Sequence, residues 1–149
     1  MAYDNMVDTR KGLQAMVGMT FARVTGAAGD DEMVFETASG IRFVFSHYQN
    51  CCESVRVEDV CGDLEDLVGE PILMAEEVSG EIPAQDEDSY DSQTWTFYKF
   101  ATRKGYVDVR WLGESNGYYS ESVDLFVEGL SVAEMQQPSL GDLFRERLA

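Results

Sequence analysis

Basic residues are scarce in this chain. Eleven Lys and Arg stand against 28 Asp and Glu, which gives a formal net charge of −17 at pH 7. Binding to nucleic acid or to an anionic membrane depends mainly on cationic side chains, so we expect direct binding to neither. The acidity has two interpretations: a surface that keeps the protein in solution, or a surface that attracts a basic partner protein.

Cysteine and long apolar runs are also in short supply. Three cysteines, two of them adjacent, do not form a disulfide framework, and they predict a reduced, cytosolic protein. No segment approaches the roughly 18 apolar residues that a membrane span needs. Residues 1–5 lack the basic start and the apolar stretch of a signal peptide, so we expect no secretion.

The usual sequence signatures of catalysis are missing. The chain contains no Gly-rich phosphate loop, nucleophile elbow or metalloprotease helix. His47 is the single histidine, and it lies too close in sequence to Cys51 and Cys52 to act as their base without a tight loop. A zinc set of His47 with the three cysteines is disfavoured, because adjacent cysteines in a strand point to opposite faces. We therefore predict no enzyme, metal or cofactor.

What the chain does contain is a pattern that occurs twice. Residues 12–18 (GLQAMVG) are echoed by residues 63–69 (DLEDLVG). Each copy continues through a predicted strand and a hairpin, and each ends at Glu-Ser-Val. Matching gaps differ by about three residues at each step, which surface turns accommodate at little cost. The two copies span about residues 12–60 and 63–128.

Hydrophobic periodicity predicts a similar set of elements in both copies. In the first copy, a short helix capped by Asp8 is followed by strands over 19–25, 34–37, 41–47 and 55–58. In the second copy, a helical turn over 62–67 is followed by strands over 71–78, 94–102, 106–112 and 123–127. The acidic stretch 80–92 is interpreted as a solvated loop.

These elements predict a mainly β protein (α+β with short helices). Two tandem copies of a strand–hairpin–strand unit form a barrel-like or sandwich arrangement, in one domain over residues 1–130. Residues 131–149 form a C-terminal tail with a short amphipathic helix, which docks on its own domain, a second subunit or a partner. Short edge strands and a twofold interface favour a homodimer.

Two loops that follow the predicted hairpins, 47–53 and 110–121, are rich in polar and aromatic residues. If an approximate twofold axis relates the copies, these loops lie near the same edge and form a small-ligand pocket suited to a planar base. The alternative is that Asn116 and Gly117 form a turn, the tyrosines cover the core and the polar groups hold loop backbone. The predicted ligand-binding residues are His47, Gln49, Asn50, Glu53, Arg110, Trp111, Ser115, Asn116, Tyr118, Tyr119 and Glu121.

Five segments of the chain are distinctive as strings. They are HYQNCCESV at 47–55, GDL at 62–64, GEPILMAEE at 69–77, TWTFYK at 94–99 and GESNGYYSE at 113–121. Together they resemble an uncharacterised family of small tailed-phage proteins, from about Leu13 to about Val127. Cys61 and the tail after Gly129 are not part of this pattern. The family has no assigned activity, so the resemblance implies a source, a phage accessory gene, more than a chemistry.

The leading hypothesis is a phage-encoded, non-enzymatic binding protein that acts in the host cytoplasm against a host defence. It would sequester a small nucleotide-like signal between the two loops. Trp111, Tyr118 or Tyr119 would stack on the ligand, and Arg110 would supply a cation. Hydrogen bonds would come from Gln49, Asn50 and Asn116. The alternative is an acidic inhibitor, a nucleic-acid mimic that blocks a basic host protein through residues 30–32, 58–70 and 86–91. A virion or assembly component is the third possibility.

Overall fold

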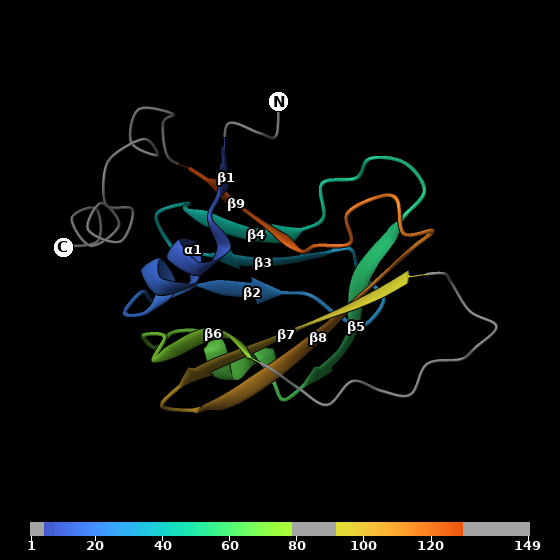
Figure 1. Ribbon diagram of the computed structural model, residues 1–149. Coiled ribbons are helices and arrows are strands. Elements are labelled where there is room, and N and C mark those ends of the chain that lie inside the picture. Colours follow the sequence, from blue (N-terminus) through green and yellow to red (C-terminus); the bar gives the residue numbers. More distant parts are fainter. Residues whose placement is uncertain (1–4, 79–91, 130–149) are drawn as a thin grey trace.

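Two antiparallel sheets form a sandwich in the computed structural model, which describes residues 5–78 and 92–129 (Figure 1). One sheet has the strand order β1-β9-β4-β3-β2, and the other has the order β5-β8-β7-β6. The predicted β fold is confirmed, in its sandwich form, since the described strands do not close into a barrel. The strands are β1 (Met6–Val7), β2 (Arg23–Thr25), β3 (Glu32–Glu36), β4 (Arg42–Ser46), β5 (Ser54–Cys61), β6 (Met74–Val78), β7 (Ser92–Thr102), β8 (Gly105–Ser115) and β9 (Asp124–Glu128).

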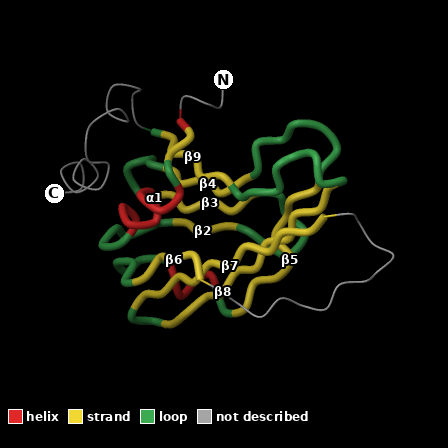
Figure 2. The backbone as a smooth tube through the Cα atoms, viewed as in Figure 1, coloured by secondary structure: helices red, strands yellow, loops and turns green. Residues whose placement is uncertain are grey.

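Each sheet is a three-stranded meander completed by the last strand of the other copy. β2, β3 and β4 pair in sequence, and β9 from the second copy lies beside β4. In the other sheet β6, β7 and β8 pair in sequence, and β5 from the first copy lies beside β8. The two copies therefore have the same strand order and exchange their final strands (Figure 2).

The segments that precede β2 and β6 contact each other between the two copies. The N–H of Gly18 donates to the carbonyl oxygen of Ile72 (2.8 Å), and the N–H of Gly69 donates to that of Phe21 (2.9 Å). Both glycines have positive φ angles, 91° and 81°, a conformation that glycine adopts without steric cost. These matching hydrogen bonds indicate an approximate twofold axis between the copies.

The helix α1 (Thr9–Met16) contacts β9 of one sheet and β6 of the other, so it covers one side of the sandwich (Figure 1). Asp8 caps it by accepting a hydrogen bond from a first-turn backbone N–H at 3.0 Å. Leu13 and Met16 are buried on its inner face. Gly12 permits the close approach, because a Cβ atom there would lie 2.3 Å from the side chain of Leu125.

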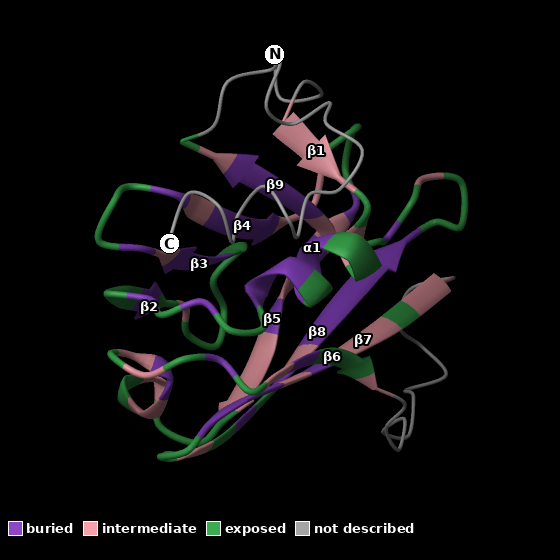
Figure 3. Ribbon diagram, turned by 90° about the vertical axis from the view of Figure 1, so that its left-hand side faces the viewer, coloured by how far each residue is buried: buried purple, intermediate pink, exposed green. Residues whose placement is uncertain are grey.

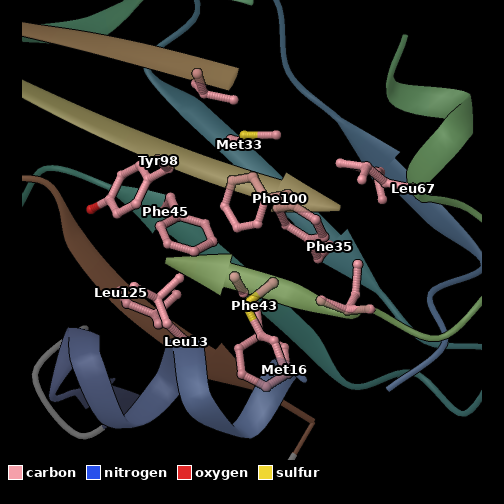
Figure 4. Close-up of a cluster of buried hydrophobic side chains, with 14 of the residues drawn as sticks. Leu13, Met16, Met33, Phe35, Phe43, Phe45, Leu67, Tyr98, Phe100 and Leu125 are labelled. Atoms are coloured by element: carbon pink, nitrogen blue, oxygen red, sulfur yellow. The ribbon is translucent and has the colours of Figure 1, made fainter. Parts of the chain in front are cut away.

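Aromatic rings fill the space between the sheets (Figure 4). Buried residues lie on strands of both sheets and on α1 (Figure 3). Phe35 lies 4.8 Å from Phe100, and Phe45 lies 5.2 Å from Tyr98, measured between ring centroids. Each pair joins one sheet to the other, and none of the four side chains is more than 1% exposed. Burial of each such side chain stabilises the fold by roughly 1.5–3 kcal/mol.

Two predicted strands begin later than expected. The prediction placed strands over 19–25 and 71–78, whereas β2 begins at Arg23 and β6 begins at Met74. Residues 18–21 and 69–72, in front of these strands, hydrogen bond to each other across the twofold axis, so regular pairing with the hairpins begins only after them. β1 was not predicted, because two residues are too few to show a period.

Two predictions lie outside the described residues. These are the acidic loop predicted over residues 80–92, of which only Ser92 is described, as the first residue of β7, and the C-terminal helix within residues 131–149. The extent of the domain, residues 1–130, stays a prediction.

Candidate functional site at the paired loops

Two loops lie side by side at one end of the sandwich (Figure 1). The first loop (residues 47–53) joins β4 to β5, and the second loop (residues 116–123) joins β8 to β9; together we call them the paired loops. Nδ1 of His47 in the first loop lies 2.7 Å from the carbonyl oxygen of Ser122 in the second. The structure therefore brings together the two loops that the repeat predicted to be neighbours.

Glu53 holds the first loop together from the inside. Its side chain is 0% exposed and accepts hydrogen bonds from the backbone N–H groups of Asn50 (2.9 Å) and Cys51 (2.8 Å). Nε2 of His47 lies 2.7 Å from the same carboxylate. Burial alone would raise the pKa of Glu53, but the hydrogen bonds from His47 and the backbone outweigh it and lower the pKa to about 2. Both ring nitrogens of His47 thus lie beside oxygen atoms, one of Glu53 and one of Ser122.

Glu121 has the corresponding role in the second loop. It is buried, and it accepts hydrogen bonds from the hydroxyl groups of Ser115 and Thr94, the latter at 2.7 Å. Burial raises its pKa, but these hydrogen bonds lower it by more, so the carboxylate stays ionised. Gly113 on β8 makes room for this loop, because a Cβ atom there would lie 2.6 Å from the carbonyl oxygen of Glu121.

The amide side chains of the predicted site shape the loops themselves. Nε2 of Gln49 donates to the carbonyl oxygens of Cys51 (3.2 Å) and Glu53 (2.5 Å). Oδ1 of Asn116 accepts a hydrogen bond from the backbone N–H of Tyr118 at 3.0 Å, which forms an Asx turn. These contacts match the alternative in which polar groups hold loop backbone.

The tyrosines of the second loop do not cover the core. Tyr118 is 83% exposed, and its ring packs edge-to-face against Tyr119 at 4.9 Å between centroids. The interaction of Tyr119 with Cys51 of the first loop raises the pKa of the Tyr119 hydroxyl. The paired loops thus present an aromatic edge to solvent.

Arg110 and Trp111 do not belong to this edge, which corrects their assignment to the ligand site. Trp111 faces inward from β8 and is 1% exposed, so a ligand at the paired loops has no access to its ring. Arg110 faces outward and pairs with Asp59 on β5, with Nε 2.9 Å from Oδ2. Successive residues of a strand point to opposite faces, and both residues lie within β8 rather than in a loop.

The outer face of the second sheet contains a cluster that was not predicted. Trp95 and Phe97 stack with centroids 6.2 Å apart and an interplanar angle of 9°, and the guanidinium of Arg110 lies 5.4 Å from the Trp95 ring. The alternation of Trp95, Phe97 and Lys99 along one strand was the available signal.

The possible zinc ligands do not converge. Cys61 lies at the end of β5, where it pairs with Asp108, whereas His47 and the other cysteines lie in the first loop. Among the described residues, no group of three or more His, Cys, Asp or Glu is placed to hold a metal. However, the Sγ atoms of Cys51 and Cys52 lie only 2.9 Å apart. The expectation of opposite faces is wrong here because these residues form a bend, not a strand.

A third loop lies at the same end of the sandwich (Figure 1). Residues 26–31 join β2 to β3 and pack on β5, where Gly29 donates to the carbonyl oxygen of Val57 at 2.8 Å. Asp30, Asp31 and Glu32 are exposed there. None of the three loops contains Lys or Arg. We call this acidic and aromatic surface, formed by residues 26–32 and the paired loops, the loop end.

A hollow of about 740 Å³ lies elsewhere, between α1 and β6. Its walls include Leu13, Val17, Leu73, Glu76 and Glu77. None of the predicted ligand-binding residues lines it, so it is separate from the loop end.

In the part of the chain that the structure describes, no helix has the length and apolar character to span a membrane. The family described as "Domain of unknown function (DUF7448)" matches residues 14–125. No curated protein and no solved structure matches the chain.

Proposed function

Because the chain belongs to the DUF7448 family, whose description names no activity, we propose a function from the geometry: a non-enzymatic binding protein whose loop end binds a basic protein. The observation that carries the proposal is the exposed tyrosine edge on a surface whose three loops contain no Lys or Arg. The phage resemblance supplies the setting, in which the partner is a host defence protein in the host cytoplasm.

Support comes first from the construction of the paired loops. Glu53 is buried and bonded within its own loop, and Glu121 is buried and bonded to β7 and β8, so both fix loop shape instead of contacting a partner. A preformed surface loses little conformational entropy on binding. Tyr118 and Tyr119 project from this rigid base, and tyrosine is one of the residues that most often dominates a binding interface.

Charge supports a basic partner. Most described Arg and Lys side chains pair with carboxylates on the strands, as in Arg42–Glu128 and Arg110–Asp59. Asp31 and Glu32 form no ion pair with any described residue. A surface with unpaired carboxylates attracts a positively charged protein and speeds its association at low salt.

The small nucleotide-like ligand loses most of its proposed contacts. Trp111 is in the core, Arg110 is paired on the outer face, and Gln49 is engaged by loop backbone. The geometry therefore favours the protein-binding form over sequestration of a small signal.

The test is capture of host proteins by the immobilised full chain, with bound proteins identified by mass spectrometry and their affinity then measured. Tyr118→Ala should weaken binding of the captured basic protein at least about tenfold, as for an interface hot spot. Changing Asp30, Asp31 and Glu32 to their amides should slow association and flatten its salt dependence.

Tyr106→Ala is the matched control, because Tyr106 is 64% exposed on β8 at the β7–β8 hairpin, remote in register from the paired loops. Equal losses in the Tyr106 and Tyr118 variants would contradict the proposal. A rise in melting temperature with nucleotides that Tyr118→Ala abolishes would support the small-ligand form instead.

A further inference from the structure

Two neighbouring thiols lie exposed in the first loop, and neither contributes to the packing of the fold. Cys51 and Cys52 form a bend between β4 and β5, and their Sγ atoms lie 2.9 Å apart. Neither side chain packs into the core. We propose that Cys51 and Cys52 are a redox site, which low-molecular-weight disulfides oxidise reversibly to a disulfide between adjacent residues.

The loop holds the thiols in this arrangement. The N–H of Cys51 donates to Oε1 of Glu53 at 2.8 Å, and the N–H of Asn50 donates to Oε2 at 2.9 Å. Because Glu53 is buried and fixed, it holds the backbone of the bend in the conformation in which the two sulfur atoms lie close together. The position of the pair therefore follows from the buried carboxylate and not from chance contact at the surface.

Cys51 is the sulfur that the surroundings favour as nucleophile. Its Sγ atom lies 2.9 Å from that of Cys52, and this contact raises the pKa of the Cys52 thiol. A thiol with a raised pKa is less often present as the thiolate, which is the form that attacks a disulfide, so Cys52 is the poorer attacking group. Cys52, which keeps its proton longer, lies within reach as the second thiol.

The reaction balances with a small disulfide as the oxidant. The Cys51 thiolate attacks one sulfur of the disulfide, whose S–S bond breaks and releases one thiolate. The Cys52 thiolate, formed as its proton passes to solvent, then attacks the Cys51 sulfur and releases the second thiolate. Both released thiolates take up a proton as thiols, so the pair loses two electrons and two protons, and the small disulfide gains them.

The bond that forms is expected to be strained and easily reduced. The sulfur atoms must approach from 2.9 Å to about 2.05 Å. Adjacent Cα atoms lie about 3.8 Å apart across a trans peptide, which is less than the usual separation in a disulfide. Strained, exposed disulfides have high reduction potentials and belong to the labile class. The site should therefore be oxidised only under oxidising conditions and recover afterwards.

The test treats the full chain with mixtures of oxidised and reduced glutathione, blocks free thiols with iodoacetamide and measures intact mass and tryptic peptides. Cleavage after Arg42 and Arg56 places both cysteines in the peptide of residues 43–56, separate from Cys61. In oxidising mixtures we expect this peptide to escape alkylation and to be about 2 Da lighter than its dithiol form, whereas in excess reduced glutathione it should carry an iodoacetamide-derived group on each cysteine.

The variants separate the two steps. Cys52→Ser should stop at a stable glutathione adduct on Cys51, and Cys51→Ser should react several-fold more slowly at Cys52. Cys61→Ser should behave as the unmodified chain. The proposal would be overturned if the unmodified chain formed a glutathione adduct but no disulfide. It would also be overturned if the Cys51 and Cys52 variants reacted with glutathione disulfide at equal rates. The outcome is independent of any partner at the loop end.

Discussion

Nε2 of His47 lies 2.7 Å from Oε2 of Glu53, and the two side chains are 3% and 0% exposed. The other ring nitrogen of His47 contacts the carbonyl oxygen of Ser122 in the second loop. One buried pair of side chains therefore fixes the first loop and attaches it to the second. Four predictions follow from this pair and from the arrangement of the strands.

The first prediction concerns acid stability. The pKa of Glu53 is lowered from 4.5 to about 2 in the folded protein, so its stabilising contribution is complete above pH 4.5 and is lost as the pH falls toward 2. Glu53→Gln lacks this contribution. Urea unfolding at a series of pH values should show the two proteins differing most above pH 4.5 and converging toward pH 2. Glu76→Gln, at an exposed carboxylate on β6, should show no such convergence.

The second prediction separates the core aromatic from the exposed one. Trp111→Ala should destabilise the fold by about 3–5 kcal/mol, because it removes a side chain that is 1% exposed. Tyr118→Ala should change the free energy of unfolding by no more than about 0.5 kcal/mol. Urea unfolding of both variants checks this, and similar losses in the two would mean that Tyr118 is not free of the core.

A third prediction addresses the end of an exchanged strand. Gly129 follows β9 with a φ angle of 92°, and a Cβ atom there would lie 2.5 Å from the carbonyl oxygen of Gly40. Gly129→Ala should therefore cost more than the roughly 1–2 kcal/mol of a left-handed alanine. Gly40→Ala is the control, since Gly40 has a φ angle of 94° but no atom within 4 Å of such a Cβ. Equal midpoints of urea unfolding for the Gly129 and Gly40 variants would contradict the close approach of Gly129 to the carbonyl oxygen of Gly40.

The fourth prediction is that neither copy folds alone. A fragment of residues 1–62 has the meander β2-β3-β4 without β9, and a fragment of residues 63–149 has β6-β7-β8 without β5. Each should lack a cooperative unfolding transition by circular dichroism, and mixing them should restore it. A fragment that unfolds cooperatively by itself would show that strand exchange is not required.

Much of the fold was predictable, because the alternation of apolar and polar residues and the turn residues mark the strands in both copies. The hairpins around Gly40 and Gly105 and the strands β5 and β9 were placed within a few residues by alternation and turn residues. Strand exchange was not predictable, since the same alternating pattern is satisfied whether β5 pairs with its own meander or with the other. Only the packing of the two copies decides between them.

The site was predictable in position but not in chemistry. The repeat indicated that the loops following the two hairpins lie near the same edge of the structure. It did not indicate that Gln49 and Glu53 are used within the first loop, because those hydrogen bonds depend on the backbone path of the bend. Trp111 was misplaced because its inward direction follows from the register of β8 with β5 and β7.

The exchanged strands also bear on how such a chain could arise. A half-length ancestor with a single copy would have held three strands of a sheet and one strand that its own sheet did not accept. It would have been completed only by a second copy that donated its last strand in return, as an obligate symmetric dimer. Gene fusion would then have turned that bimolecular encounter into an intramolecular one, with a high effective concentration, and would have freed the two loops to diverge.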